Sequence, residues 1–206
     1  TRLLNAFTEN GLMLFAFFYL YALYVLACAM FSKGKILFAD AAKAVVSTAY
    51  IVCGFSCVVA TRDLPNGMFL LIMVFVVAFS TDIFAYFSGM LFGRHKLIPE
   101  VSPKKTIEGS IGGIVFCALS FVAFGWIVDF FFGQNANLWF LLVSGVIISL
   151  VSQIGDLITS VIKRHYGIKD FGKIFPGHGG ILDRFDSVLA VSIMLAFICS
   201  YFNLFI

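Results

Sequence analysis

The chain has 206 residues, of which 61% are hydrophobic and 12% are charged, and its mean hydropathy is +1.03. Soluble domains average roughly 45–50% apolar and about 25% charged residues, so this composition excludes a soluble globule, and disordered chains deviate in the opposite direction. The apolar runs are continuous, which excludes an outer-membrane barrel, whose strands alternate polar and apolar residues. The net charge of +3 is small, so its distribution is more informative than its size.

Six apolar segments are long enough to cross a bilayer, which takes about 20 apolar residues in a helix. In chain order, the predicted helices cover residues 11–32, 42–61, 68–92, 109–133, 138–162 and 186–206. We therefore predict an all-α fold, a polytopic membrane bundle of about six transmembrane helices. The five cysteines lie inside these apolar runs, without the spacing of a disulfide framework or a zinc site.

The basic residues predict the orientation of the bundle. Twelve of the 14 lie in or beside the loops on one side, whereas the other side has only Arg2 and Arg62. The positive-inside rule places the basic side in the cytoplasm. Six helices then leave both ends of the chain outside, and the chain begins at Thr1 rather than Met. We therefore expect the intact protein to have further helices upstream.

Two of the cytoplasmic loops carry an unusual mixture of residues. They read GRHKLIPEVSPKKTIEGSIGG at 93–113 and KRHYGIKDFGKIFPGHGGILDRFD at 163–186. Lysine and arginine bind phosphate oxygens, and glycine lets backbone N–H groups approach an anion closely. Basic loops often serve only topology and contact with anionic lipid, but that alternative does not account for the PGHGG run. These loops therefore predict a phosphate-binding surface.

Acidic residues inside the apolar segments are the next signal. Asp82 shares one face of the third predicted helix with Tyr86, and Asp156 lies in the fifth. An aspartate at the centre of a membrane helix costs roughly 2.5–3.5 kcal/mol on insertion scales, so such residues usually face the bundle interior and serve function. The alternative is a structural pair with Lys or Arg near the membrane surface. Asp129, near the outer end of the fourth helix, is predicted to be interfacial.

A further acidic pair flanks Arg184 at the start of the sixth predicted helix. Asp183 and Asp186 follow PGHGG directly, and acids at this position are often only helix caps. Carboxylates among several cations also suit Mg²⁺ with a polyphosphate, because Mg²⁺ takes one or two carboxylates together with substrate phosphates. His178 could donate a proton, contact phosphate or only shape the loop.

These motifs resemble a known family. SPKKTIEG at 102–109 and the run 160–186, which contains PGHGG and DRFD, closely resemble the phosphatidate cytidylyltransferases, also called CDP-diacylglycerol synthases. DIFAYFSG at 82–89 and the Gly-Asp pair at 155–156 match further family positions, so the resemblance covers about residues 75–206. It implies transfer of a cytidylyl group from CTP to phosphatidic acid, giving CDP-diacylglycerol and pyrophosphate for phospholipid biosynthesis.

The resemblance also implies roles for individual residues. Asp156 and Asp183 are expected to bind Mg²⁺, with room for a second cation. The expected catalytic residues are Asp156, Asp183, Lys163, Arg164, Asp170, His178 and Asp186. The expected phosphate-binding residues are Lys104, Lys105, Ser102, Lys169, Arg184, Gly179 and Gly180. Asp82, Tyr86 and Glu108 are expected to support them.

The expected organisation and partners follow. Residues 1–70 are predicted to form N-terminal transmembrane helices, and 71–206 a catalytic transmembrane domain with cytoplasmic loops 93–109 and 163–186. The expected partners are CTP, phosphatidic acid and membrane lipids, with no nucleic acid. The expected location is the inner or plasma membrane of a bacterium, with the active site facing the cytoplasm.

Two other functions and one structural question stay open at this point. A CTP-dependent polyprenol or phytol kinase would share CTP, Mg²⁺ and a helical membrane fold, but would transfer the γ-phosphate to an alcohol. A transporter for an anionic solute would place cations along the whole path, whereas here the charges gather at one face. The small-residue spacing in GSIGG suits close helix packing within one chain or in a homo-oligomer.

Overall fold

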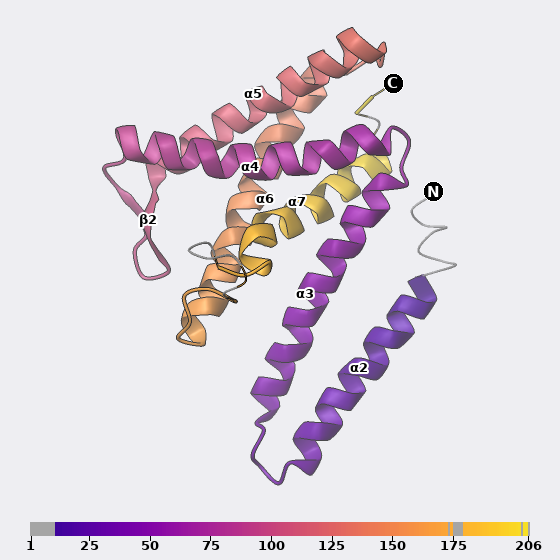
Figure 1. Ribbon diagram of the computed structural model, residues 1–206, viewed down its shortest axis with the longest axis vertical. Helices are drawn as coiled ribbons and strands as arrows, with labels where there is room; N and C mark the ends of the chain where they lie inside the picture. The colour runs from indigo at the N-terminus through magenta and orange to yellow at the C-terminus, as the bar shows by residue number, and fades with distance from the viewer. Residues whose placement is uncertain (1–10, 173, 175–178, 203, 206) are drawn as a thin grey trace. The chain divides into compact units, whose positions relative to one another are not determined.

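The computed structural model describes residues 11–172, 174, 179–202 and 204–205. In this part of the chain the six predicted helices are confirmed (Figure 1). Their bounds are α2 Gly11–Phe31, α3 Phe38–Arg62, α4 Gly67–Phe92, α5 Ile107–Phe132, α6 Leu138–His165 and α7 Leu182–Tyr201. Helices α3 to α6 are each long and apolar enough to cross a membrane, which supports the polytopic all-α fold.

The chain forms two compact units, Thr1–Ser56 and Cys57–Ile206. In the first unit, α2 and the beginning of α3 are joined by a hydrogen bond of 3.0 Å between the hydroxyl groups of Tyr21 and Thr48. Most large side chains of α2 are exposed and apolar, as expected for a helix that faces lipid. All residues with predicted site roles belong to the second unit.

The core of the second unit lies where α4, α5, α6 and α7 meet. Its largest fully buried side chains include Met73 of α4, Phe121 of α5, Ile148 of α6 and Leu195 of α7. An isolated bridge between Ala136 and Phe205 adds a contact between the α5–α6 loop and the segment after α7. This core fixes the four helices against one another and thereby positions the charged residues at their ends.

Glycine and small residues bring α4 and α5 into close contact. A Cβ atom on Gly109 would lie 2.6 Å from the backbone oxygen of Ala85, and one on Gly113 would lie 3.0 Å from the Ala85 Cβ. A Cβ atom on Gly112 would overlap the Ser88 side chain. These glycines therefore let two membrane helices approach closely, which is the role that small residues play between transmembrane helices.

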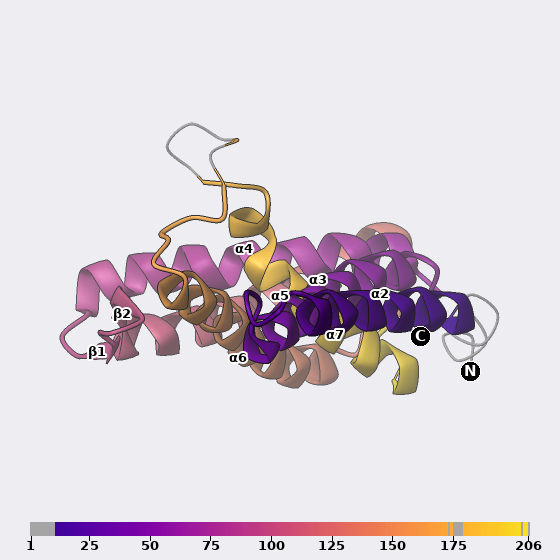
Figure 2. The ribbon, with the colours of Figure 1, turned by 90° about the horizontal axis from the view of Figure 1, so that it is seen from below.

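A short hairpin interrupts the helical pattern between α4 and α5. Strands β1 (Lys96–Ile98) and β2 (Ser102–Thr106) pair antiparallel, with Lys96 opposite Thr106 and Ile98 opposite Ser102. Figures 1 and 2 both place this hairpin at the end of α4 and the beginning of α5. The sequence predicted only a loop over residues 93–109, so the strands are a structural feature that it did not reveal.

Candidate active site at the ends of α4 to α7

Glu108 anchors the hairpin to the first turn of α5. Its carboxylate accepts hydrogen bonds from the backbone N–H groups of Arg94 at 3.1 Å and His95 at 3.2 Å. The same carboxylate lies 2.7 Å from Nδ1 of the His95 ring. Thr106 caps α5, since its hydroxyl oxygen accepts from the N–H of Gly109 at 3.1 Å. These contacts hold both ends of the hairpin and so position the lysines of β2.

A cavity of about 330 Å³ lies beside this hairpin. Its walls come from α4, β1, β2, α5 and α6. The polar residues that line it are Asp82, Tyr86, Lys104, Lys105, Thr106, Ser110, Gln153 and Asp156. Its large apolar lining residues are Met90 and Leu97. The structure thus brings the SPKK lysines of β2 together with both intramembrane aspartates that the sequence singled out.

Lys105 and Asp156 form an ion pair at this cavity. The Lys105 ammonium contacts the Oδ2 atom of Asp156, and the two side chains are 26% and 22% exposed. Asp156 also interacts electrostatically with Asp82 of α4 and Asp186 of α7. Three carboxyl groups thus lie near one another here, and Lys105 pairs with one of them.

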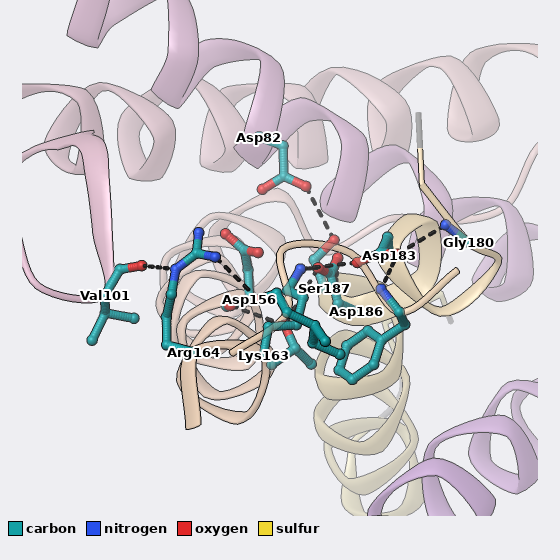
Figure 3. A network of polar contacts seen from close by, with 12 residues as sticks. Asp82, Val101, Asp156, Lys163, Arg164, Gly180, Asp183, Asp186 and Ser187 are labelled. Atoms are coloured by element: carbon teal, nitrogen blue, oxygen red, sulfur yellow. Dashed lines mark hydrogen bonds and ion pairs between the residues drawn. The ribbon is translucent and has the colours of Figure 1, made fainter. Parts of the chain in front are cut away.

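A second lysine–aspartate pair, between α6 and α7, is more deeply buried. The Lys163 ammonium lies 3.0 Å from Oδ1 of Asp183 and 4.0 Å from Oδ2 of Asp186, with the three side chains between 5% and 10% exposed. The other oxygen of Asp183 accepts hydrogen bonds of 2.8 Å from the backbone N–H groups of Phe171 and Gly180 (Figure 3). Asp183 therefore ties the loop before α7 to the end of α6.

Opposing effects set the charge of Asp183. Burial alone would raise the pKa of this carboxyl group, but the Gly180 N–H, Lys163 and the Phe171 N–H all stabilise the charged form, so its pKa lies below the ordinary value. The Lys163 ammonium also lies 5.4 Å from the centre of the Phe171 ring. Asp183 is therefore held as a carboxylate with a fixed orientation.

Groups of Ser187 and Thr159 bind the other two carboxyl groups of the site, those of Asp82 and Asp186. The Ser187 hydroxyl donates to Oδ2 of Asp82 at 3.1 Å, and the Ser187 N–H donates to Oδ1 of Asp186 at 2.9 Å (Figure 3). The Thr159 hydroxyl lies 3.3 Å from Oδ2 of Asp186. The sequence reasoning did not select either residue, although small polar residues beside intramembrane acids were a usable signal.

Ser110 and Gln153 form a further polar contact that the sequence reasoning missed. The Ser110 hydroxyl donates to the Gln153 side-chain oxygen at 2.5 Å, and the Gln153 amide donates to the Ser110 backbone oxygen at 3.1 Å. The Gln153 side chain thus has a hydrogen bond at each end of its amide. A glutamine within an apolar helix was the signal, because polar groups in lipid need internal partners.

The remaining predicted residues lie around these contacts. Arg164 is exposed and donates to the backbone oxygens of Val101 at 3.4 Å and Ile168 at 3.2 Å, so it links the hairpin turn to the end of α6. Three predicted residues are exposed: Lys169 and Asp170 on the loop before α7, and Arg184 in the first turn of α7. Ser102 begins β2, and Gly179, which has φ +83°, precedes Gly180. His178 lies outside the described residues.

The acidic residues suit Mg²⁺ only in combination with a phosphate ligand. Among the described residues, no three His, Cys, Asp or Glu side chains converge closely enough to hold a metal ion. Carboxylate oxygens are nevertheless the protein ligands that Mg²⁺ prefers, and one or two are enough when substrate phosphates supply further ligands. Asp156, which pairs with Lys105 and lies near two further carboxyl groups, would be one such ligand.

Comparison with known proteins identifies the family. A family model described as the cytidylyltransferase family matches residues 2–202. The chain belongs to this family. It is 45% identical over 167 residues to the phosphatidate cytidylyltransferase of Staphylococcus haemolyticus strain JCSC1435 and 46% identical over 168 residues to that of Staphylococcus aureus strain COL. Each match covers 81% of this chain and 62% of the relative, so the chain spans about three fifths of these curated relatives.

The family match confirms the resemblance drawn from the SPKKTIEG and PGHGG–DRFD motifs. It extends that resemblance, because the matched region begins at residue 2 rather than near residue 75. The helices of the first unit therefore belong to the family region as well, although their sequence shows little besides hydrophobicity.

Proposed function

We propose that this protein transfers a cytidylyl group from CTP to phosphatidic acid, giving CDP-diacylglycerol and pyrophosphate. The observation that carries the proposal is the cavity beside Asp156, where lysines and carboxylates gather at the ends of membrane helices. One substrate is a polyanion from water and the other is an anionic lipid. A charged site at the end of a membrane helix bundle gives both of them access. The names of the staphylococcal relatives support the same reaction.

The chemistry requires positioning more than a strong base. An oxygen of the lipid phosphate attacks the α-phosphorus of CTP, the bond from that phosphorus to the bridging oxygen breaks, and pyrophosphate leaves with that oxygen. The attacking phosphate is already anionic at neutral pH. The principal tasks of the protein are therefore to align the two phosphates and to neutralise the charge that they bring together.

The lysines and carboxylates divide these tasks. Lys104 and Lys105 would hold phosphate oxygens at the cavity, and Lys163 and Arg184 would do so near the start of α7. Asp156 and Asp183 would hold Mg²⁺, with Asp186 supporting them from beside Lys163. Bound Mg²⁺ would polarise the nucleotide phosphates and stabilise the pyrophosphate as it forms. Asp82 and Ser187 would keep the acidic groups in place through their hydrogen bond.

We further propose that this site faces the cytoplasm. The excess of Lys and Arg lies on the loops at the hairpin side, and the opposite α5–α6 loop contains no Lys or Arg. A cysteine introduced at Lys104 should react with an impermeant thiol reagent only when the cytoplasmic face is open, and one at Asn135 should react from outside. Reaction of both from the same face would contradict this orientation.

Labelled CTP tests the reaction most simply. Purified protein in bilayers that contain phosphatidic acid, a polyprenol and phytol is supplied with CTP labelled at either the α- or the γ-phosphorus. We expect α-label in a lipid product and γ-label in pyrophosphate. Transfer of γ-label to a polyprenol or phytol would instead identify the lipid kinase. Absence of label from lipid in every reaction would favour the anion transporter.

A further inference from the structure

The basic residues of the site form two separate groups. Lys104 and Lys105 lie on β2 and line the cavity, whereas Lys163 is buried between α6 and α7 and does not line it. Lys169 and Arg184 are exposed on the loop before α7 and in its first turn. Asp156 connects the two groups, because it pairs with Lys105 of the first and interacts with Asp186, which lies 4.0 Å from Lys163 of the second. A reaction between two phosphates needs two such subsites that meet at one point.

Most polar groups that line the cavity already have partners. Lys105 pairs with Asp156, Ser110 with Gln153, and Asp82 with Ser187. The Thr106 hydroxyl caps α5. Within the described residues, the Lys104 ammonium and the Tyr86 hydroxyl are the two side-chain groups of this lining with no hydrogen bond or ion pair. Lys104 therefore offers a positive charge that no carboxylate of the described chain neutralises.

The rest of the lining suits a lipid better than a nucleotide. Met90 and Leu97 give the cavity an apolar side next to the cation, and both Met90 and Tyr86 are exposed on α4, one of the helices long enough to span a membrane. An anionic group beside an apolar stem would satisfy both sides of the cavity. A cytosine ring and a triphosphate would leave the apolar side without a hydrophobic partner.

We infer that this cavity binds the phosphate monoester headgroup of the lipid substrate, with Lys104 as its main cation and the Tyr86 hydroxyl as a second donor. The nucleotide phosphates bind on the other side of Asp156, toward Lys163 and the start of α7. The inference rests on the proposed function for the identity of the lipid as phosphatidic acid. The two basic groups thus receive different substrates, and β2 is the element that selects the lipid.

A binding experiment tests the subsite without catalysis. The purified protein is titrated calorimetrically, in Mg²⁺-free buffer without CTP, with dihexanoyl phosphatidic acid, dihexanoyl phosphatidylcholine or glycerol 3-phosphate. We expect the monoester lipid to bind most tightly, because the diester carries less charge and glycerol 3-phosphate lacks the apolar stem. Equal binding of glycerol 3-phosphate would mean a simple phosphate site, and equal binding of phosphatidylcholine would mean a hydrophobic site; either result overturns the inference.

The matched variants are Lys104→Ala, Lys104→Arg and Lys96→Ala. Lys96 lies on β1 of the same hairpin, is exposed, and does not line the cavity. Losing a charge-assisted phosphate contact should weaken binding of phosphatidic acid roughly ten- to a hundred-fold in Lys104→Ala. Lys104→Arg should recover part of that loss, and Lys96→Ala should bind as the unaltered protein does.

Steady-state kinetics give the second measurement. In Lys104→Ala, the KM for phosphatidic acid should rise while the KM for CTP stays within about two-fold of its original value. A rise in the KM for CTP alone would place the nucleotide in this cavity and overturn the inference, as would unchanged values for both substrates. If the unaltered protein binds the monoester lipid through Lys104 but makes no CDP-diacylglycerol, the proposed function fails and the lipid subsite stands.

Discussion

The two lysine–aspartate pairs of the site differ in burial and in backbone support. Lys105 and Asp156 are each about one quarter exposed at a cavity, and Asp156 has other carboxylates close by. Lys163 and Asp183 are at most 10% exposed, and two backbone N–H groups fix the second oxygen of Asp183. The first pair is open to the cavity, whereas the second, besides its proposed part in the chemistry, holds the loop before α7 in place. Burial and backbone support thus distinguish a pair that serves binding from one that also serves architecture.

The largest effect is expected from Asp183→Asn, which should damage both architecture and chemistry. Breaking a buried ion pair from one side costs about 3–5 kcal/mol, because the remaining charge stays buried without its partner. We therefore expect lower thermal stability and almost no turnover. Thermal unfolding in detergent, together with turnover per folded molecule, separates the two effects.

Asp129→Asn is the matched control for Asp183→Asn. Asp129 lies near the far end of α5, away from the hairpin. Its substitution should leave both measurements close to those of the unaltered protein. If Asp183→Asn behaved as this control does, the buried pair would have neither of the roles assigned to it.

A smaller effect is expected where α4 and α5 touch. In Gly109→Ala the added Cβ would meet the Ala85 backbone oxygen and the Thr106 hydroxyl, so the helices must separate. Overpacking of this kind costs typically 1–3 kcal/mol. Thr106 is the last residue of β2 and directly precedes α5, so a shift of α5 should also move the lysines of β2. We therefore expect turnover to fall together with stability.

Ile111→Ala provides the control on the same helix. Ile111 is 57% exposed on α5, and its truncation leaves the contact with α4 intact. Stability and turnover should both stay near the original values. Equal stability losses in Gly109→Ala and Ile111→Ala would show that close packing of α4 on α5 does not position the hairpin.

The smallest effect is expected from Glu108→Gln, which tests whether anchoring of the hairpin affects binding of the lipid. The amide keeps an oxygen for the backbone N–H groups of Arg94 and His95 but loses the charge opposite the His95 ring. We expect the KM for phosphatidic acid to rise roughly two- to ten-fold, the range for one lost hydrogen bond, with little change in thermal stability. Glu100→Gln, at the exposed hairpin turn, should leave the KM unchanged; an equal rise there would contradict a specific role for Glu108.

The helices and the general location of the site could be predicted from the sequence. Apolar runs of about 20 residues leave few structures other than membrane helices, because backbone groups in lipid must bond within the segment. Charged residues inside such runs are costly and therefore conspicuous, so Asp82 and Asp156 stood out. The structure places both at one cavity with Lys104 and Lys105.

The hairpin and the hydroxyl contacts could not be predicted in the same way. Ser102–Thr106 contains proline and two lysines, which have low strand propensity, and its pairing depends on Glu108 and Thr106 at the start of α5. Ser187 reaches Asp82 across 105 residues of sequence. The sequence reasoning left the glycines of GSIGG open as anion contacts or as packing residues, and the structure shows that Gly109, Gly112 and Gly113 pack against α4.

Turnover of Asp156→Asn across a Mg²⁺ titration tests most directly whether the two substrates meet at Asp156. Asparagine keeps the shape of the side chain but loses the charge that Mg²⁺ and Lys105 both require. We predict almost no turnover per folded molecule at any Mg²⁺ concentration, with thermal stability close to that of the unaltered protein because the pair is partly exposed. Unaltered turnover with an unchanged Mg²⁺ requirement would contradict the account and remove Asp156 from the site.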